Sequence, residues 1–122
     1  MHRVSFIDCE SGTDLIVAFA VEEPEDPGAV ESLIALRTPK FEGFLEEWER
    51  GAMCSFGPPK GDNDRSLLRK VSFDQANQTI ELRCDSANYE LSIARVDKSE
   101  IARMRKTFRK MNFDSSIELD GL

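Results

Sequence analysis

The side chains that most often carry catalysis are few in this sequence. The only histidine is His2, beside the N-terminus, where little fixed structure is expected. A serine or cysteine nucleophile needs an oriented base, which argues against hydrolases of these types. No glycine-rich phosphate loop, zinc-ligand pair or HExxH motif is present. We therefore predict a protein that is not an enzyme and holds no cofactor or metal. An enzyme that uses carboxylates alone is the remaining catalytic alternative.

The cysteines indicate no redox or metal chemistry. Cys9, Cys54 and Cys84 are odd in number, lie far apart and each falls in a strand-like run, which is poor evidence for disulfides or a zinc site. We predict buried free thiols. Residues 62–64, Asp-Asn-Asp, resemble a fragment of a calcium loop, but the required glycine and glutamate are missing. A solvated loop is the favoured interpretation there.

Acidic side chains gather in the first half of the chain. The formal net charge is −7, and residues 1–60 hold 12 Asp and Glu against 5 Lys and Arg, whereas residues 61–122 hold 11 against 11. An acidic surface repels nucleic acid and anionic membranes and attracts basic proteins. We predict a basic protein partner, no nucleic acid and no membrane. No secretory signal begins the chain, so we expect a cytoplasmic location.

Two acidic segments form the candidate binding surface. Residues 22–26 are a proline-containing acidic loop, and residues 42–49 place carboxylates around the single tryptophan. Charge speeds association and an aromatic anchor supplies buried area. A solvated helix face with the tryptophan in the core explains the second segment equally well. The predicted partner-binding residues are Glu22, Glu23, Glu25, Asp26, Glu42, Glu46, Glu47, Trp48 and Glu49.

A basic cluster lies in the second half, where residues 103–110 include five cations opposite the apolar side of a predicted helix. We favour a solvated face near the negative end of the helix dipole, because no aromatic residues interleave these charges on that face as in single-strand binders. The alternative function is a small-ligand or lipid-head-group-binding β-domain in which Arg103, Arg109 and Lys110 supply the charge.

Apolar patterns predict strands over most of the chain. Residues 3–9 and 15–21 form a hairpin, and the second of these strands is apolar on both faces, which indicates a central position in the sheet. Residues 30–38 and 52–56 are further strands.

The spacing of apolar and turn residues predicts the structure of two further segments. Residues 41–48 repeat apolar residues at intervals of three and four, which predicts a short amphipathic helical turn. Residues 66–96 hold three strand-like runs separated by two similar turns, Asp-Gln-Ala-Asn and Asp-Ser-Ala-Asn. They predict a three-stranded meander.

A helix follows the meander. Asp97 and Glu100 match a capping box at its start. Asn112 in the left-handed conformation would end it and let Phe113 pack back onto the helix. Residues 114–122 carry no strong pattern and are expected to fray. The predicted buried stripe is Ile101, Met104, Phe108 and Met111.

These elements predict a single domain over residues 1–122. Its fold class is α+β: a mainly antiparallel sheet or partial barrel of about seven strands with one C-terminal α-helix over one face or open end. A pleckstrin-homology-like arrangement is one candidate topology.

This pattern resembles certain small immunity proteins of bacterial polymorphic toxin systems. The resemblance covers most of the chain. It implies a non-enzymatic inhibitor that binds one cognate toxin in the cytoplasm, and many such toxins are basic nucleases. The similar parts are residues 15–20, the acidic loop, residues 32–37, residues 49–51 ahead of a strand, the meander and the helix over residues 101–113.

Overall fold

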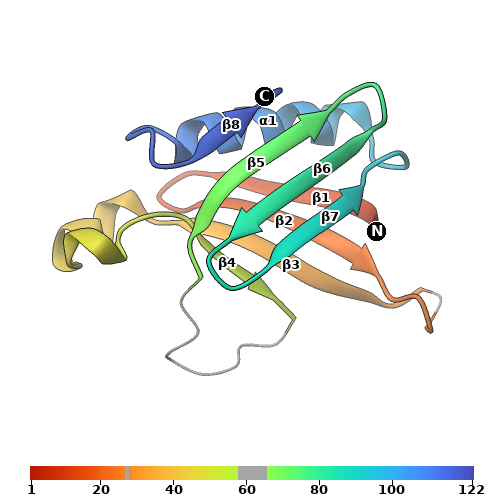
Figure 1. Cartoon of the computed structure of the whole chain (residues 1–122), viewed down its shortest axis with the longest axis horizontal. Coiled ribbons are helices and arrows are strands. Elements are labelled where there is room, and N and C mark those ends of the chain that lie inside the picture. The colour runs from red at the N-terminus through yellow and green to blue at the C-terminus, as the bar shows by residue number, and fades with distance from the viewer. Residues whose placement is uncertain (27, 58–65) are drawn as a thin grey trace.

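The computed structural model describes residues 1–26, 28–57 and 66–122; the Asp-Asn-Asp triplet at 62–64 lies outside them. The predicted α+β class is confirmed, with one α-helix and eight strands in the described part of the chain rather than about seven (Figure 1). The elements are β1 (His2–Ser11), β2 (Leu15–Glu22), β3 (Val30–Arg37), the 3-10 helices η1 (Pro39–Phe44) and η2 (Glu47–Glu49), β4 (Met53–Phe56), β5 (Leu68–Asp74), β6 (Thr79–Cys84), β7 (Asn88–Ser92), α1 (Lys98–Met111) and β8 (Glu118–Asp120).

The strands form one open sheet in the order β4-β3-β2-β1-β7-β6-β5-β8. The predicted first hairpin and the β5–β6–β7 meander are antiparallel, and β2 lies between β1 and β3 as its two apolar faces indicate. The sheet is nevertheless mixed, because β1 pairs with β7 and β5 with β8 in parallel. The β1–β7 join is short, with only His2 opposite Leu91 and Arg3 opposite Ser92.

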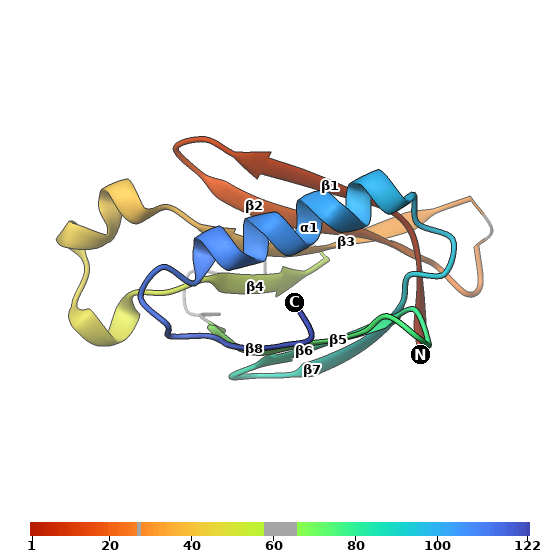
Figure 2. The same cartoon turned by 90° about the horizontal axis from the view of Figure 1, so that it is seen from above.

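The two halves of the sheet face each other as layers. Figure 2 shows β1–β4 and β5–β8 separated, with α1 lying along the opening between them. Backbone bonds from Cys54 to Ser66 and from Leu68 to Ala52, both 2.8 Å, also tie the β4 edge to the start of β5. The apolar core fills the space between the layers and the helix. Its fully buried members include Val17, Phe19, Leu33, Ile80, Leu82, Leu91, Met104, Phe108 and Met111.

Helix α1 begins where the sequence predicts, but only half of the capping box forms. The Asp97 carboxylate accepts a hydrogen bond from the Ser99 amide at 3.1 Å. The Glu100 carboxylate instead accepts from the Ile7 amide at 2.7 Å, beside a register irregularity between Val4 and Phe6. A strand irregularity leaves a backbone donor without its ladder partner. Glu100 therefore anchors α1 on β1 rather than closing its own helix turn.

The end of α1 differs from the expectation. Asn112 has φ −93° and so is not left-handed, and its side-chain oxygen accepts from the Ile117 amide at 2.8 Å. Phe113 does not return to the helix but is largely exposed. The tail expected to fray holds β8, and Gly121 follows it with φ +81°, where a Cβ would collide with the carbonyl oxygen of Phe73.

Candidate protein-binding surface

The segment that follows β3 forms one end of the molecule. Pro39 fixes the first turn of η1, and η2 follows after Glu46, whose extended backbone separates the two short helices. Neither helix buries a residue. The Arg50 guanidinium donates to the Leu45 carbonyl at 3.2 and 3.3 Å, and the Thr38 hydroxyl donates to Asp14 at 2.7 Å. The Arg50 bonds close the last turn of the segment on itself, and the Thr38 bond attaches its start to the turn between β1 and β2.

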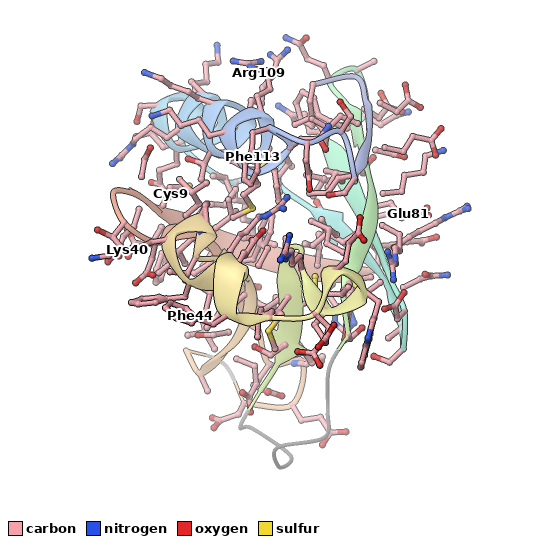
Figure 3. All side chains as sticks on the ribbon, turned by 90° about the vertical axis from the view of Figure 1, so that its left-hand side faces the viewer. Cys9, Lys40, Phe44, Glu81, Arg109 and Phe113 are labelled. Atoms are coloured by element: carbon pink, nitrogen blue, oxygen red, sulfur yellow. The ribbon has the colours of Figure 1, made fainter. Side chains whose placement is uncertain are left out.

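Large aromatic side chains project into solvent from this segment. The exposed fraction is 53% for Phe41, 87% for Phe44 and 74% for Trp48. Phe113, 58% exposed, lies at the same end of the molecule, above η1 in Figure 3. The predicted helical turn therefore forms as short 3-10 helices, but its apolar side is not buried. We call Phe41, Phe44, Trp48 and Phe113, with exposed Glu46 and Glu47 beside them, the aromatic end.

A buried arginine holds the aromatic end in place. The Arg37 side chain is 1% exposed, and its guanidinium binds Glu42 through two bonds of 2.7 and 2.9 Å and Asp114 through two of 2.7 and 2.9 Å. It also donates to the Met111 carbonyl at 2.8 Å. The Phe113 ring stacks on it, with the guanidinium carbon 4.1 Å from the ring centroid. Arg37 thus connects β3, η1 and the end of α1.

Sequence patterns contained a signal for this arginine that our prediction did not use. Leu33 and Ala35 are buried on one face of β3, and strand alternation puts Arg37 on the same face. A buried guanidinium needs carboxylate partners. Glu42, five residues later, is one of them: its side chain is 12% exposed and both of its oxygens bind Arg37. Glu42 is therefore a structural residue rather than a free partner contact.

Charge coupling in this cluster is strong. Burial alone would lower the pKa of Arg37, but the hydrogen bonds and charges of Glu42 and Asp114 outweigh it and raise that pKa. Hydrogen bonding from Arg37 lowers the pKa of the Asp114 carboxyl well below its usual range, and Ser116 adds to the effect. The ion pairs consequently stay formed at neutral pH.

The free energy of unfolding should fall at acid pH as the Asp114 carboxylate is protonated. Because its pKa is lower in the folded protein than in the unfolded chain, its contribution is complete above about pH 4 and is lost progressively as the pH falls below that value. Urea unfolding of the wild type and of Asp114→Asn at about pH 7, 5 and 3 measures this loss. The difference in free energy of unfolding should be constant between the first two conditions and smaller at the third.

The same pair of measurements in an Arg37→Met background is the control. Without the guanidinium, the main cause of the lowered pKa is gone and only the Ser116 hydrogen bonds remain, so Asp114→Asn should produce a difference that depends much less on pH. A pH-dependent difference of unchanged size in that background would show that Arg37 does not stabilise the Asp114 carboxylate.

The acidic loop at 22–26 lies at the opposite end of β3 from the aromatic end (Figure 1). An eight-residue strand spans roughly 26 Å. The Glu22 carboxylate accepts from the Ser5 hydroxyl at 3.1 Å and lies 3.8 Å from Arg95. Glu25 and Asp26 are exposed, and Glu23 is partly buried. The two predicted acidic segments are thus separate surfaces and not one.

Among the described groups with catalytic or metal-binding potential, the Cys54 and Cys84 thiols are hydrogen-bonded to each other, but they gather no third ligand. His2 is not in a loose terminus but begins β1, with its ring 5.8 Å from that of Phe56. Cys54 and Cys84 are buried free thiols as predicted, whereas Cys9 is partly exposed. Within residues 1–26, 28–57 and 66–122, no three His, Cys, Asp or Glu side chains gather in a metal-binding group. The helices described here include none with the length and apolarity to span a bilayer.

Comparison of the chain with protein families, with curated proteins and with solved structures found no match.

Proposed function

We propose that this chain is a non-catalytic protein-binding module that docks a basic protein through its aromatic end. The observation that carries the proposal is the exposure of Phe41 and Phe44 on η1 and of Trp48 on η2, between 53% and 87%. Soluble proteins seldom leave a group of large apolar side chains in water unless the patch meets a partner. Tryptophan in particular is enriched among the residues that dominate binding energy.

Charge supports a basic partner rather than an acidic one. Glu46 and Glu47 are exposed next to Trp48, and the whole chain carries a net charge of −7. Carboxylates around an aromatic anchor steer a cationic surface toward it and disfavour acidic competitors. The anchor then supplies burial once the surfaces meet.

Preorganisation favours this end over the 22–26 loop. The Arg37 bonds to Glu42, Asp114 and the Met111 carbonyl fix the base of the aromatic end before any partner arrives. Segments that are already ordered lose less conformational entropy on binding. An inhibitor of a toxin needs a surface of this kind, because it must bind tightly enough to prevent the toxin's action.

We further propose that the partner is a basic toxin and that the protein is an immunity-type inhibitor in a bacterial cytoplasm. The support is the resemblance carried by the strand, meander and helix patterns together with the acidic surface. A toxin gene beside the gene for this chain would be direct genetic support.

Trp48→Ala should weaken partner binding by about 30-fold or more, the effect expected of a central aromatic anchor. A partner is first cross-linked to the purified protein in a lysate of the source cells. It is then purified and titrated calorimetrically with wild type and variant. Phe6→Ala is the matched control, because Phe6 is a half-exposed ring on β1 away from the aromatic end; it should bind like the wild type.

Charge reversal separates the two acidic surfaces. Glu46→Lys combined with Glu47→Lys should slow association with the purified partner, and the effect should shrink as salt is added. The pair Glu25→Lys and Asp26→Lys makes the same charge change at the other end of β3 and should have a smaller effect. Equal effects of the two pairs, or an unchanged affinity of Trp48→Ala, would overturn the proposed docking surface.

A further inference from the structure

A second candidate binding site lies beside the first turns of α1, well away from the aromatic end. It is a pocket of about 260 Å³ between α1, the turn that joins β5 to β6, and the chain after β7. Its lining combines apolar and polar side chains. The lining residues are Phe73, Ile93, Ile101 and Ala102, with Gln75, Gln78, Lys98 and Arg105.

Arg105 is the unusual member of this lining. Its guanidinium lies over the Phe73 ring, 5.3 Å from the centroid. Its Nε atom is buried and has no hydrogen-bond acceptor among the described residues. A buried donor without an acceptor is costly and rare in folded proteins. The buried Nε is itself closed to a ligand, so only the terminal nitrogens of this guanidinium, which are not buried, can meet one.

The charge of the pocket selects the ligand. Lys98 and Arg105 are the charged groups among the described lining residues, so the pocket is cationic although the protein as a whole is acidic. Of the cations suggested from sequence for a small-ligand site, Arg103, Arg109 and Lys110, none is in this lining. The Arg109 guanidinium donates to the Leu122 carbonyl and the Lys110 amine to the Ser11 hydroxyl.

We propose that this pocket binds a small carboxylate with an apolar body, such as a medium-chain acid. The carboxylate accepts from the terminal nitrogens of the Arg105 guanidinium, and Lys98 adds positive charge. The apolar body lies against Ile93 and Ile101. A volume of 260 Å³ is below the range of drug-sized pockets, which favours a short ligand over a long lipid chain.

This site goes beyond the proposed protein-binding function and does not depend on it. The residues of α1 that line the pocket lie near the start and middle of the helix, whereas the aromatic end is attached to the last residues of the helix. Loss of one activity should therefore leave the other intact, and the two proposals are tested with different variants.

Octanoate is the probe for the test, and amide chemical shifts of the full chain are the readout. Saturable shifts are expected for residues 73–78, 93 and 98–105.

Arg105→Met removes the guanidinium but retains an apolar stem, and should weaken octanoate binding at least about tenfold, as expected for a charged hydrogen bond. Arg109→Met makes the same charge change on the same helix outside the pocket and should bind like the wild type. 1-Octanol, which has the same chain without the charge, should bind at least about tenfold more weakly than octanoate.

A second variant keeps the test decisive if Arg105→Met does not fold. Ala102→Glu places a carboxylate at an exposed helix position that lines the pocket. It should repel octanoate, while the amide spectrum of the variant remains that of a folded protein. The proposal is overturned if no saturable shifts occur, if they centre on the aromatic end, or if Arg105→Met and Arg109→Met bind octanoate equally.

Discussion

Replacing Arg37 with methionine is expected to lower the free energy of unfolding by about 3 kcal/mol, the lower end of the range for breaking a buried ion pair. Methionine fills part of the space but leaves the carboxylates of Glu42 and Asp114 without their shared cation. Glu42 is 12% exposed and cannot easily regain water, whereas Asp114 is 40% exposed and can. Partial hydration of Asp114 is the reason for choosing the lower end.

Urea unfolding followed by circular dichroism at neutral pH measures this loss. Arg69→Met is the matched control, because Arg69 makes a similar 2.6 Å bond to Asp85 with both side chains well exposed. Exposed pairs contribute about 0–1 kcal/mol. If the two substitutions cost the same, the Arg37 cluster does not carry the structural role assigned to it.

Phe108→Ala should be the second large effect, with a cost of about 3–5 kcal/mol. Phe108 is fully buried on α1, and its ring stacks on Phe19 of β2 with centroids 6.3 Å apart. Truncation removes one aromatic contact between the helix and the β1–β4 layer and leaves a cavity that the surrounding side chains fill only partly.

The same unfolding measurement serves for Phe108→Ala, with Phe6→Ala as its control. Phe6→Ala removes the same atoms from a half-exposed position on β1. Surface substitutions usually change the free energy of unfolding by no more than about 0.5 kcal/mol. A small cost for Phe108→Ala would mean that α1 is held to the sheet mainly by polar bonds such as that from Glu100 to the Ile7 amide.

Local patterns predicted most of the elements. Alternation in residues 15–21 identified β2 and its central position, because a strand covered on both faces is apolar on both. Helical spacing identified Met104, Phe108 and Met111 as buried, although Ile101 is only partly so. These features depend on residues close in sequence, where periodicity is informative.

Pairings between distant segments were not predictable in the same way. The parallel join of β1 to β7 and the short β8 beside β5 involve residues far apart in the chain and few residue pairs. Glu100 matches a capping box by spacing, but the Ile7 amide of another element takes its carboxylate. Tertiary contacts decide such cases, and single-sequence patterns do not contain them.

The candidate site was predicted in part. The tryptophan segment was recognised from its composition, yet the sequence could not decide between a core ring and an exposed one, since both produce the same spacing. The structure places Trp48 in solvent and turns Glu42 inward. The pocket beside α1 was not foreseen, because its walls come from three separate stretches of chain.

Exposed rings also bear on how the protein behaves when it is concentrated. Copies that each present Phe41, Phe44 and Trp48 to water have a reason to stick to one another. The seven excess negative charges keep such copies apart. Acidification protonates carboxylates and so reduces that repulsion, and added salt screens it, while the rings stay exposed. Mildly alkaline, low-salt solutions are therefore the ones in which the molecule stays dispersed.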